Sequence, residues 1–497
     1  MISPARRWSL LAVVSSALLL IALDNTVLYT ALPTLIEELG ASTSQSLWIM
    51  NAYPVVMAGL LLGAGTLGDR LGHVLMFRFG LTVFGVASLV AAYAPSTGVL
   101  IGARAFLAVG AASMMPATLA LIRVTFEDVR ERKLAIAVWG SGAVVGAAIG
   151  PIIGGALLEV FWWGSVFLIN VPVVVIALIG TFLIAPPDRT DERQTWDLTS
   201  SLLAMAGLVS VVIAIKEFAS LPPSWPIVGV AVTVAVVSLT LFTRRQLRLA
   251  HPLLDFAIFR NNAFSAGVLA AALTMFVLGG LQLVTTQRFQ LVEEFTPLQS
   301  GLLVTAAALG SAPTALLAGG FLHRVGLRPL IAGGLAVTTI GVVLAAATFT
   351  APIPVFVIAL VVTGLGLGAV MGVASTAIVG NAPAHRAGMA SSVEEVSYEF
   401  GNLTAVAFIG SLVALVYTAT LTLPAGAPPE AGDSLATTLL YANGDSDLVE
   451  TARAAFDHAY LVVMIVIAVV TALGAGASRY LLRHHGAGVP ASAHPHH

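Results

Sequence analysis

Five charged residues stand inside long apolar stretches of this sequence, and carboxylates in such positions can bind protons and cations. Asp24 and Arg104 occur singly, whereas Glu394, Glu395 and Glu399 share one stretch. A charged side chain in the hydrocarbon layer costs roughly 2.5–3.5 kcal/mol on insertion scales and is therefore a candidate for function. These five residues are the primary candidates for proton and ligand binding.

Asp24 and Arg104 form the natural pair, because each is the single charge of its stretch. An aspartate beside an arginine stays ionised, whereas burial favours its protonated form. We therefore predict that Asp24 takes up a proton when its partner moves away. A permanent ion pair that only holds helices together is the alternative interpretation.

Glu395 and Glu399 are four residues apart, so both lie on one face of a helix, with Glu394 and Tyr398 on an adjoining face. Two such carboxylates do not ionise together readily, and one is expected to hold a proton at neutral pH. An incoming cation would favour the ionised form and displace that proton. In the alternative, the helix starts later in the membrane and Glu394 and Glu395 face water.

Aromatic and sulfur-containing side chains near these charges would suit a hydrophobic cation. Trp48, Tyr53, Met115 and Tyr398 are the candidates, since rings offer cation–π contacts and methionine packs adaptably. For any single one of them, ordinary packing between helices or against lipid is the better explanation.

The elements that position these side chains are membrane helices. Hydrophobic residues make up 58% of the 497 residues and charged residues only 10%, against about 25% charged in a typical soluble domain. A helix needs about 20 apolar residues to cross the hydrocarbon layer. Fourteen spans are predicted, at 8–30, 46–68, 75–94, 97–122, 134–158, 163–185, 197–216, 225–243, 263–285, 299–322, 328–349, 353–379, 391–418 and 458–482.

The basic residues indicate how these spans are oriented. With the N-terminus inside, nineteen Lys and Arg residues fall in cytoplasmic segments, and only Lys216, Arg288 and Arg453 fall in outer ones. Basic residues concentrate on the cytoplasmic side of membrane proteins. We therefore predict a multi-pass protein of the cell (inner) membrane with both termini cytoplasmic and a long external loop at about 419–457.

An internal repeat accompanies the span count. Gly65-Thr-Leu-Gly-Asp-Arg-Leu-Gly72 and Gly319-Gly-Phe-Leu-His-Arg-Val-Gly326 share Gly, Arg and Gly at a constant offset of 254 residues, in what are predicted to be two loops. Secondary transporters are often built from such repeats, with the substrate path between the halves. The predicted organisation is a six-helix bundle at 1–190, two inserted helices with a linker at 191–262, and a second six-helix bundle at 263–497.

Four segments in order resemble motifs of the major facilitator superfamily. Residues 65–72 resemble the motif between its second and third helices, and 100–110, with Arg104, resemble its fourth-helix motif. Residues 146–155 resemble the fifth-helix motif of antiporters. Residues 23–33 resemble the first-helix motif of the fourteen-helix drug:proton antiporters, and the similarity covers nearly the whole chain.

The resemblance implies an all-α membrane protein with the major facilitator fold, fourteen helices, and proton-driven export of quaternary ammonium compounds, dyes and biguanides. It also implies gating or sealing roles for residues of the matched motifs. These are Gly65, Gly68, Asp69, Arg70, Gly72, Gly146, Gly150, Pro151, Gly154, Gly155 and, in the second copy, Arg324. A solvated loop and close helix packing are the alternative interpretations.

Two positions depart from the pattern of that family. Asn51 stands where many of these pumps carry an aspartate, and Ser311 lies near an acidic position of the tenth helix. Both differences reduce the negative charge available to a dication. Asn51 is nevertheless retained among the candidate substrate residues.

Other classes of protein fit the sequence less well. Neither lysine, Lys133 or Lys216, follows a glycine, so no phosphate-binding loop of an ATP-driven pump is present. No nucleophile or metal cluster indicates an enzyme, a metal site or a cofactor, and a net charge of −2 indicates no nucleic-acid partner. We expect a monomer that handles small cationic molecules and protons. A symporter or exporter of another organic solute, and a non-transporting membrane sensor, remain as alternatives.

Overall fold

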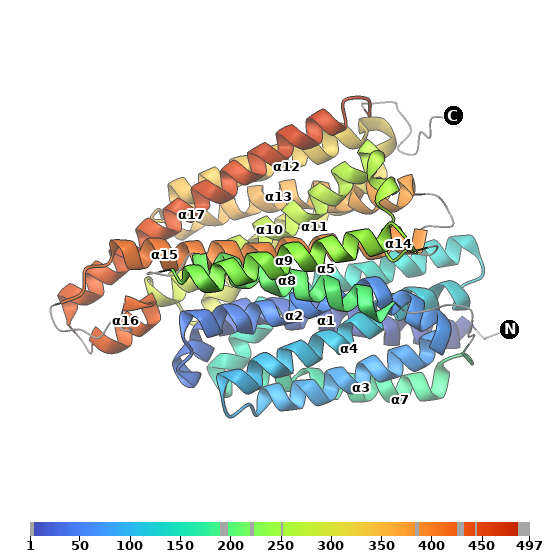
Figure 1. Cartoon of the computed structure of the whole chain (residues 1–497), viewed down its shortest axis with the longest axis horizontal. Coiled ribbons are helices and arrows are strands. Elements are labelled where there is room, and N and C mark those ends of the chain that lie inside the picture. The colour runs from blue at the N-terminus through green and yellow to red at the C-terminus, as the bar shows by residue number, and fades with distance from the viewer. Residues whose placement is uncertain are drawn as a thin grey trace. The chain divides into compact units, whose positions relative to one another are not determined.

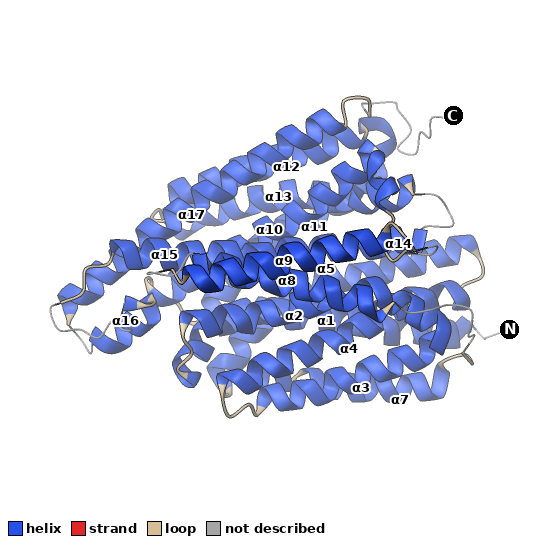
Figure 2. Cartoon of the chain, in the orientation of Figure 1, coloured by secondary structure: helices blue, strands red, loops and turns tan. Residues whose placement is uncertain are grey.

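The computed structural model describes residues 4–188, 197–218, 223–249, 252–382, 387–424, 432–442 and 445–485. Within these ranges every regular element is helical and no strand occurs (Figure 2). Long helices are expected in a membrane, because each backbone N–H and C=O must be satisfied inside its own segment where water is absent. The prediction of an all-α membrane protein is confirmed.

The chain divides into two compact units, of which unit 1 comprises Met1–Ala206 and Thr296–Gly301. Its helices run in chain order along the blue to green part of Figure 1. They are α1 (Pro4–Leu39), α2 (Thr43–Leu71), α3 (His73–Ala92), α4 (Thr97–Thr125), α5 (Val129–Val160), α6 (Ser165–Leu168), α7 (Asn170–Ile184) and the first part of α8 (Leu198–Phe218).

Unit 2 comprises Gly207–Phe295 and Leu302–His497. Two helices are divided between the units. Unit 2 holds α8 from Gly207 onward and α11 from Leu302 onward. Its elements are α9 (Trp225–Gln246), η1 (Phe256–Arg260), α10 (Asn262–Leu291), α11 (Pro297–Val325), α12 (Leu327–Thr348), α13 (Ile353–Ile378), η2 (Val379–Asn381), α14 (Ala387–Thr404), the π-helical turn η4 (Ala405–Ile409), α15 (Gly410–Thr420), α16 (Leu435–Ala442) and α17 (Ser446–Leu481).

Local capping fixes where several of these helices begin. Ser42 and Gln45 form a reciprocal capping box at the start of α2, and Asn261 and Asp445 accept backbone N–H groups at the starts of α10 and α17. Such caps satisfy the donors that the first turn of a helix leaves unpaired.

Thirteen helical stretches among the described residues are long and apolar enough to cross a membrane. They correspond to thirteen of the fourteen predicted spans. The remaining predicted span, 46–68, coincides with α2, which has 29 residues. At 1.5 Å per residue this helix is longer than the roughly 30 Å hydrocarbon layer.

The repeat seen in the sequence has a structural counterpart. Gly72 joins α2 to α3 with φ +107°, and Gly326, 254 residues later, joins α11 to α12 with φ +86°. Glycine adopts positive φ without the steric penalty of a side chain, so both copies make the same abrupt link. The helix contacts repeat as well: α3 packs on α4 and α7, and α12 packs on α13 and α17.

Two predicted loops are helical. Residues 65–71 belong to α2 and 319–325 belong to α11, because their small and apolar residues continue the helix up to the single linking glycine. The predicted external loop 419–457 also contains α16, and its last twelve residues begin α17. Polar residues and the Asp445 cap therefore start this helix well before its apolar part.

The two inserted helices pack through glycines. In unit 1, Gly59 of α2 faces Met205 of α8, and in unit 2, Gly207 of α8 faces Leu239 of α9. A Cβ at Gly59 would lie 2.7 Å from the Met205 Cβ. Helix α8 thus contributes to both units, with the division between Ala206 and Gly207.

Candidate functional site

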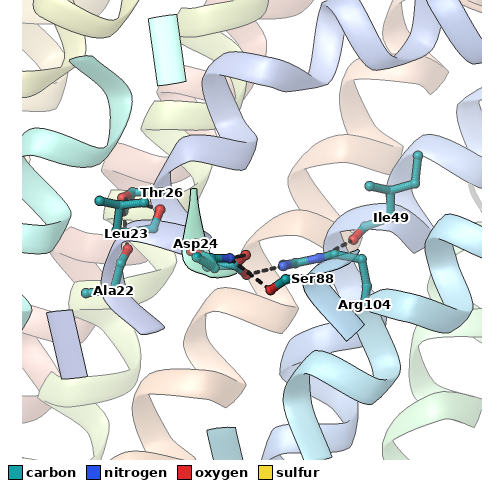
Figure 3. A network of polar contacts seen from close by, with 8 residues as sticks. Ala22, Leu23, Asp24, Thr26, Ile49, Ser88 and Arg104 are labelled. Carbon is teal, nitrogen blue, oxygen red and sulfur yellow. Dashed lines mark hydrogen bonds and ion pairs between the residues drawn. The ribbon is translucent and has the colours of Figure 1, made fainter. Parts of the chain in front are cut away.

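Asp24 and Arg104 form a sealed ion pair in unit 1 (Figure 3). Arg104 Nη1 donates to Asp24 Oδ2, and each side chain is only 1% exposed. Asp24 lies on α1 and Arg104 on α4, so the fold joins two residues 80 positions apart. The predicted pair is present, and a buried pair of this kind stays stable only with further hydrogen bonds.

Helix α2 supplies further contacts to the arginine. Arg104 Nε donates to the Ile49 carbonyl oxygen at 3.3 Å, and its guanidinium lies 4.8 Å from the centre of the Tyr53 ring. Tyr53 is fully buried. The aromatic face that the sequence offered to a substrate cation is therefore in contact with the protein's own cation in this structure.

Helices α7 and α3 complete the surroundings of the carboxylate. Asn170 Nδ2 donates to Asp24 Oδ1 at 3.0 Å and also lies 3.2 Å from Ser88 Oγ. Both Asn170 and Ser88 are 0% exposed. Sequence analysis did not identify either residue, although Asn170 is a polar residue inside the apolar stretch 163–185.

The other candidate residues of unit 1 differ in their surroundings. Asn51 is completely buried, and neither amide atom has a hydrogen-bond partner among the described residues. Trp48 and Met115 are half-buried. Both polar atoms of the Asn51 amide are thus available to bind a polar group.

A row of glycines on α5 brings that helix against α1. A Cβ at Gly146 would lie 2.7 Å from the Ala22 Cβ, and one at Gly154 would lie 3.1 Å from Val27 Cγ1. At Gly150 it would overlap Thr26 Oγ1. Thr26 Oγ1 lies 3.3 Å from the Gly146 carbonyl oxygen. Small residues allow such close approach of membrane helices, so this face places α1, and Asp24 with it, directly against α5.

The other side of α5 packs on the first residues of α11. A Cβ at Gly155 would lie 2.6 Å from the Leu298 backbone nitrogen, and one at Gly301 would overlap the Pro151 carbonyl. These residues all belong to unit 1. The motif at 146–155 therefore makes two tight helix contacts, one on each side.

Helix α14 of unit 2 carries the predicted acidic set. Glu394, Glu395 and Glu399 lie within the candidate span Met389–Thr420 and are half-buried. Glu394 lies close to the side chains of Ser375 of α13 and Tyr398. The π-helical turn Ala405–Ile409 follows directly, and such turns are frequent at functional sites.

A second buried arginine lies in unit 2, where the sequence predicted an outer segment. Arg288 is within α10 and 1% exposed. Its Nε donates to Asp457 Oδ1 of α17 at 2.7 Å, and its Nη2 lies 2.9 Å from Glu293 Oε1. The guanidinium also lies 4.7 Å from the centre of the Phe349 ring. The predicted span 263–285 ends six residues before α10 does, because polar residues lower the hydropathy of the last turns of this helix.

The gating candidates lie at helix ends. A Cβ at Gly68 would be 2.8 Å from His73 Nδ1, and one at Gly72 would lie 2.6 Å from Asp188 Oδ1. Gly65 has more room, since the nearest atom would be 3.9 Å away. Arg70 and Arg324 are exposed, and the Asp69 side chain lies outside the described residues.

In the described part of the chain, no group of three or more His, Asp or Glu side chains is placed to hold a metal ion. The site residues thus fall into two sets, one in each unit. The first is the sealed network around Asp24, and the second is the carboxylate row of α14.

Comparisons with known proteins identify the family of this chain. The profile of the Major Facilitator Superfamily matches residues 14–292 and 262–427. The multidrug efflux pump LfrA of Mycolicibacterium smegmatis is 36% identical over 487 residues, 95% of this chain and 96% of LfrA. The methyl viologen resistance protein SmvA of Salmonella typhimurium is 34% identical over 422 residues, 85% of each chain.

A solved structure supports the same fold. A bacterial homologue of the human lysosomal transporter Spinster, in an inward-facing and unoccupied conformation, superimposes with a TM-score of 0.67 over 98% of this chain and 100% of that chain. The sequence identity is 16%. At this identity the likeness concerns the fold alone.

Proposed function

Because the chain belongs to the major facilitator superfamily, we propose that it exports hydrophobic organic cations across the cell membrane in exchange for protons. The observation that carries this proposal is the sealed Asp24–Arg104 pair within two apolar helices. An ionisable carboxylate in such surroundings marks a proton or ion pathway by default.

The acidic set of α14 supports the choice of a cationic substrate. Glu394, Glu395 and Glu399 offer negative charge within a span, and Tyr398 adds an aromatic ring beside Glu394. A cation that approaches these carboxylates favours their ionised forms, so its binding and proton release are coupled. Proton uptake, in turn, weakens cation binding and allows the substrate to leave.

The relatives support the same class of substrate. LfrA is a multidrug efflux pump, and SmvA is named for resistance to methyl viologen, an organic dication. We infer that this chain also acts on drug-like molecules, with cations preferred. Asn51, in place of an acidic residue, favours monovalent over divalent substrates.

The direction of transport requires an orientation, and we propose that both termini are cytoplasmic. The distribution of Lys and Arg supports this arrangement. The natural chain has no cysteine, so Asp447→Cys and Arg123→Cys each introduce one thiol. A membrane-impermeant maleimide should label the first in intact cells and the second only in everted vesicles, and the reverse pattern would reject the orientation.

The proposed exchange is tested in vesicles that contain the purified protein. An imposed pH difference should drive ethidium movement, and a protonophore should abolish it. Asp24→Asn should bind ethidium but lose the pH-driven movement. If the wild-type protein moves no organic cation under a pH difference, the proposed function is wrong. If Asp24→Asn moves ethidium normally under a pH difference, the proposed role of Asp24 is wrong.

A further inference from the structure

The hydrogen bonds around Asp24 leave one feature that the ion pair does not explain. Asn170 donates its N–H groups toward Asp24 Oδ1 and Ser88 Oγ, while its own Oδ1 is buried and accepts no hydrogen bond from the described residues. A buried amide oxygen without a donor is unfavourable, because it has lost its hydrogen bonds to water and gained none in the protein. Donation to the ionised carboxylate uses only the amide nitrogen of Asn170, so this role leaves the buried oxygen unexplained.

The amide has a donor and an acceptor on the same flat group, and a half-turn about its last bond exchanges them. In the structure, the nitrogen occupies the position that lies within 3.2 Å of both Asp24 Oδ1 and Ser88 Oγ. After a half-turn the oxygen would occupy that same position. It would then face two groups that can donate, a protonated Asp24 and the Ser88 hydroxyl.

From this geometry we propose that Asn170, together with Ser88, is a positioning group that accommodates Asp24 in both protonation states by rotating its side-chain amide. With Asp24 ionised, Asn170 Nδ2 donates to Oδ1. When a proton binds to Asp24 Oδ1, the new O–H donates to the rotated Asn170 oxygen. The Ser88 hydroxyl donates to that oxygen as well.

The proton is conserved in this step, since it moves onto Asp24 Oδ1 and leaves from the same atom. Arg104 contacts the other carboxylate oxygen, Oδ2, so the proton and the arginine use different sides of the group. These groups depend on one another for hydrogen bonds, because Asp24, Asn170 and Ser88 are all at most 2% exposed. Water therefore does not replace the lost partner in either state.

Arg104 is the charged side chain that contacts Asp24 among the described residues. The remaining described charges on the helices packed around α1 lie near helix ends. They are Arg70 on α2, Arg78 on α3, Arg123 on α4, and Glu131, Arg132 and Glu159 on α5. The pH dependence of proton exchange at Asp24 should therefore respond mainly to Arg104 and to the Asn170–Ser88 pair.

This inference rests on the proposed function, and its test is Asn170→Leu, which keeps the branching and the number of side-chain heavy atoms and removes both the donor and the acceptor. The variant should bind ethidium within about threefold of the wild-type affinity. Its pH-driven efflux should fall at least about tenfold, because both protonation states of Asp24 lose a partner. The remaining activity should peak at a more alkaline pH, because the hydrogen bond that the ionised carboxylate loses is stronger than the one that its protonated form loses. Ser88→Ala removes one neutral hydrogen bond from each state, so it should change the pH profile by a smaller amount.

The matched control is Asn381→Leu in unit 2. Asn381 is also buried, but its Nδ2 donates to the backbone oxygens of Thr376 and Ala377. This variant should lose thermal stability and keep the wild-type pH profile. An unchanged profile in Asn170→Leu would overturn the inference, whereas a wild-type protein without any proton coupling would overturn the proposed function instead.

If Asn170→Leu does not fold, infrared difference spectra of Ser88→Ala decide the question. The carbonyl band of protonated Asp24 is identified by its absence in Asp24→Asn. In Ser88→Ala it should shift away from its wild-type position, because the Asn170 oxygen that accepts from the carboxyl group has lost its second donor. A band at the wild-type position would reject the switch.

Discussion

The two units of this protein share a pattern of helix contacts but hold their buried arginines in opposite ways. In unit 1, Arg104 has one carboxylate partner, and both side chains are 1% exposed. In unit 2, Arg288 is equally buried, but its partners Asp457 and Glu293 are 28% and 42% exposed. The two carboxylates that contact Arg288 are thus partly exposed, whereas Asp24 is sealed from its surroundings.

The difference in exposure determines what happens to a carboxylate when its arginine partner moves away. A carboxylate that loses its arginine in a sealed site must take up a proton or remain charged in a low dielectric. A carboxylate that water reaches remains hydrated and loses little. The pair in unit 1 is therefore suited to couple separation to protonation, whereas the cluster in unit 2 is suited to hold α10 and α17 together.

Removal of the two arginines should give the largest contrast. Arg104→Leu should lower the free energy of unfolding by about 3–5 kcal/mol, because Asp24 would remain buried without a counter-ion. Arg288→Leu should lower it by about 1.5–3 kcal/mol, the worth of hydrogen bonds to charged groups. Unfolding in mixed detergent micelles measures both values. Equal losses of stability in the two variants would contradict the proposed difference between the two arginine sites.

The close contact between α1 and α5 in unit 1 provides the next test. Gly150→Ala should destabilise by about 1–3 kcal/mol, because the added methyl group would overlap Thr26 Oγ1 and must push α1 away. Gly140→Ala on the same helix is the control, since its Cβ would meet nothing within 4 Å. Thermal unfolding should show wild-type stability or better for the control, and the same loss in both variants would refute the tight contact.

Glu399→Gln tests whether the half-buried carboxylates of unit 2 act on the substrate. It should raise the KM for ethidium efflux about tenfold, equivalent to about 1.4 kcal/mol, because one negative charge within the span is lost. Glu293→Gln is the control, since that carboxylate already contacts Arg288. Equal KM values for Glu399→Gln and the wild-type protein would remove Glu399 from the binding site.

The smallest effect is expected for Asp457→Asn. Its side chain is 28% exposed, and Glu293 remains as a partner of Arg288, so the loss should be up to about 1 kcal/mol. Efflux and its pH profile should stay at the wild-type level. A loss of proton coupling in this variant would show that unit 2 also carries an exchange site.

Some parts of the site were open to prediction and others were not. Asp24 and Arg104 could be paired because each is the single charge of an apolar stretch, and the glycines of 146–155 indicated close packing through their spacing. Their partner helix, α1, could not be named, because spacing tells which face of a helix is small but not what covers it. The burial of Arg288 within α10 could not be foreseen for a related reason, since a buried arginine and a loop arginine look alike in sequence.

The sequence by itself determined the membrane helices, their approximate limits, the repeat of 254 residues and the rarity of charge within the spans. All of these follow from hydropathy and spacing along the chain, which are local properties. Only the tertiary structure decided that Asn170 and Ser88 meet Asp24, and that Asp457 meets Arg288. Asn170 and Asp24 lie 146 residues apart, and hydrogen bonds over such separations depend on how helices pack, which no local pattern records.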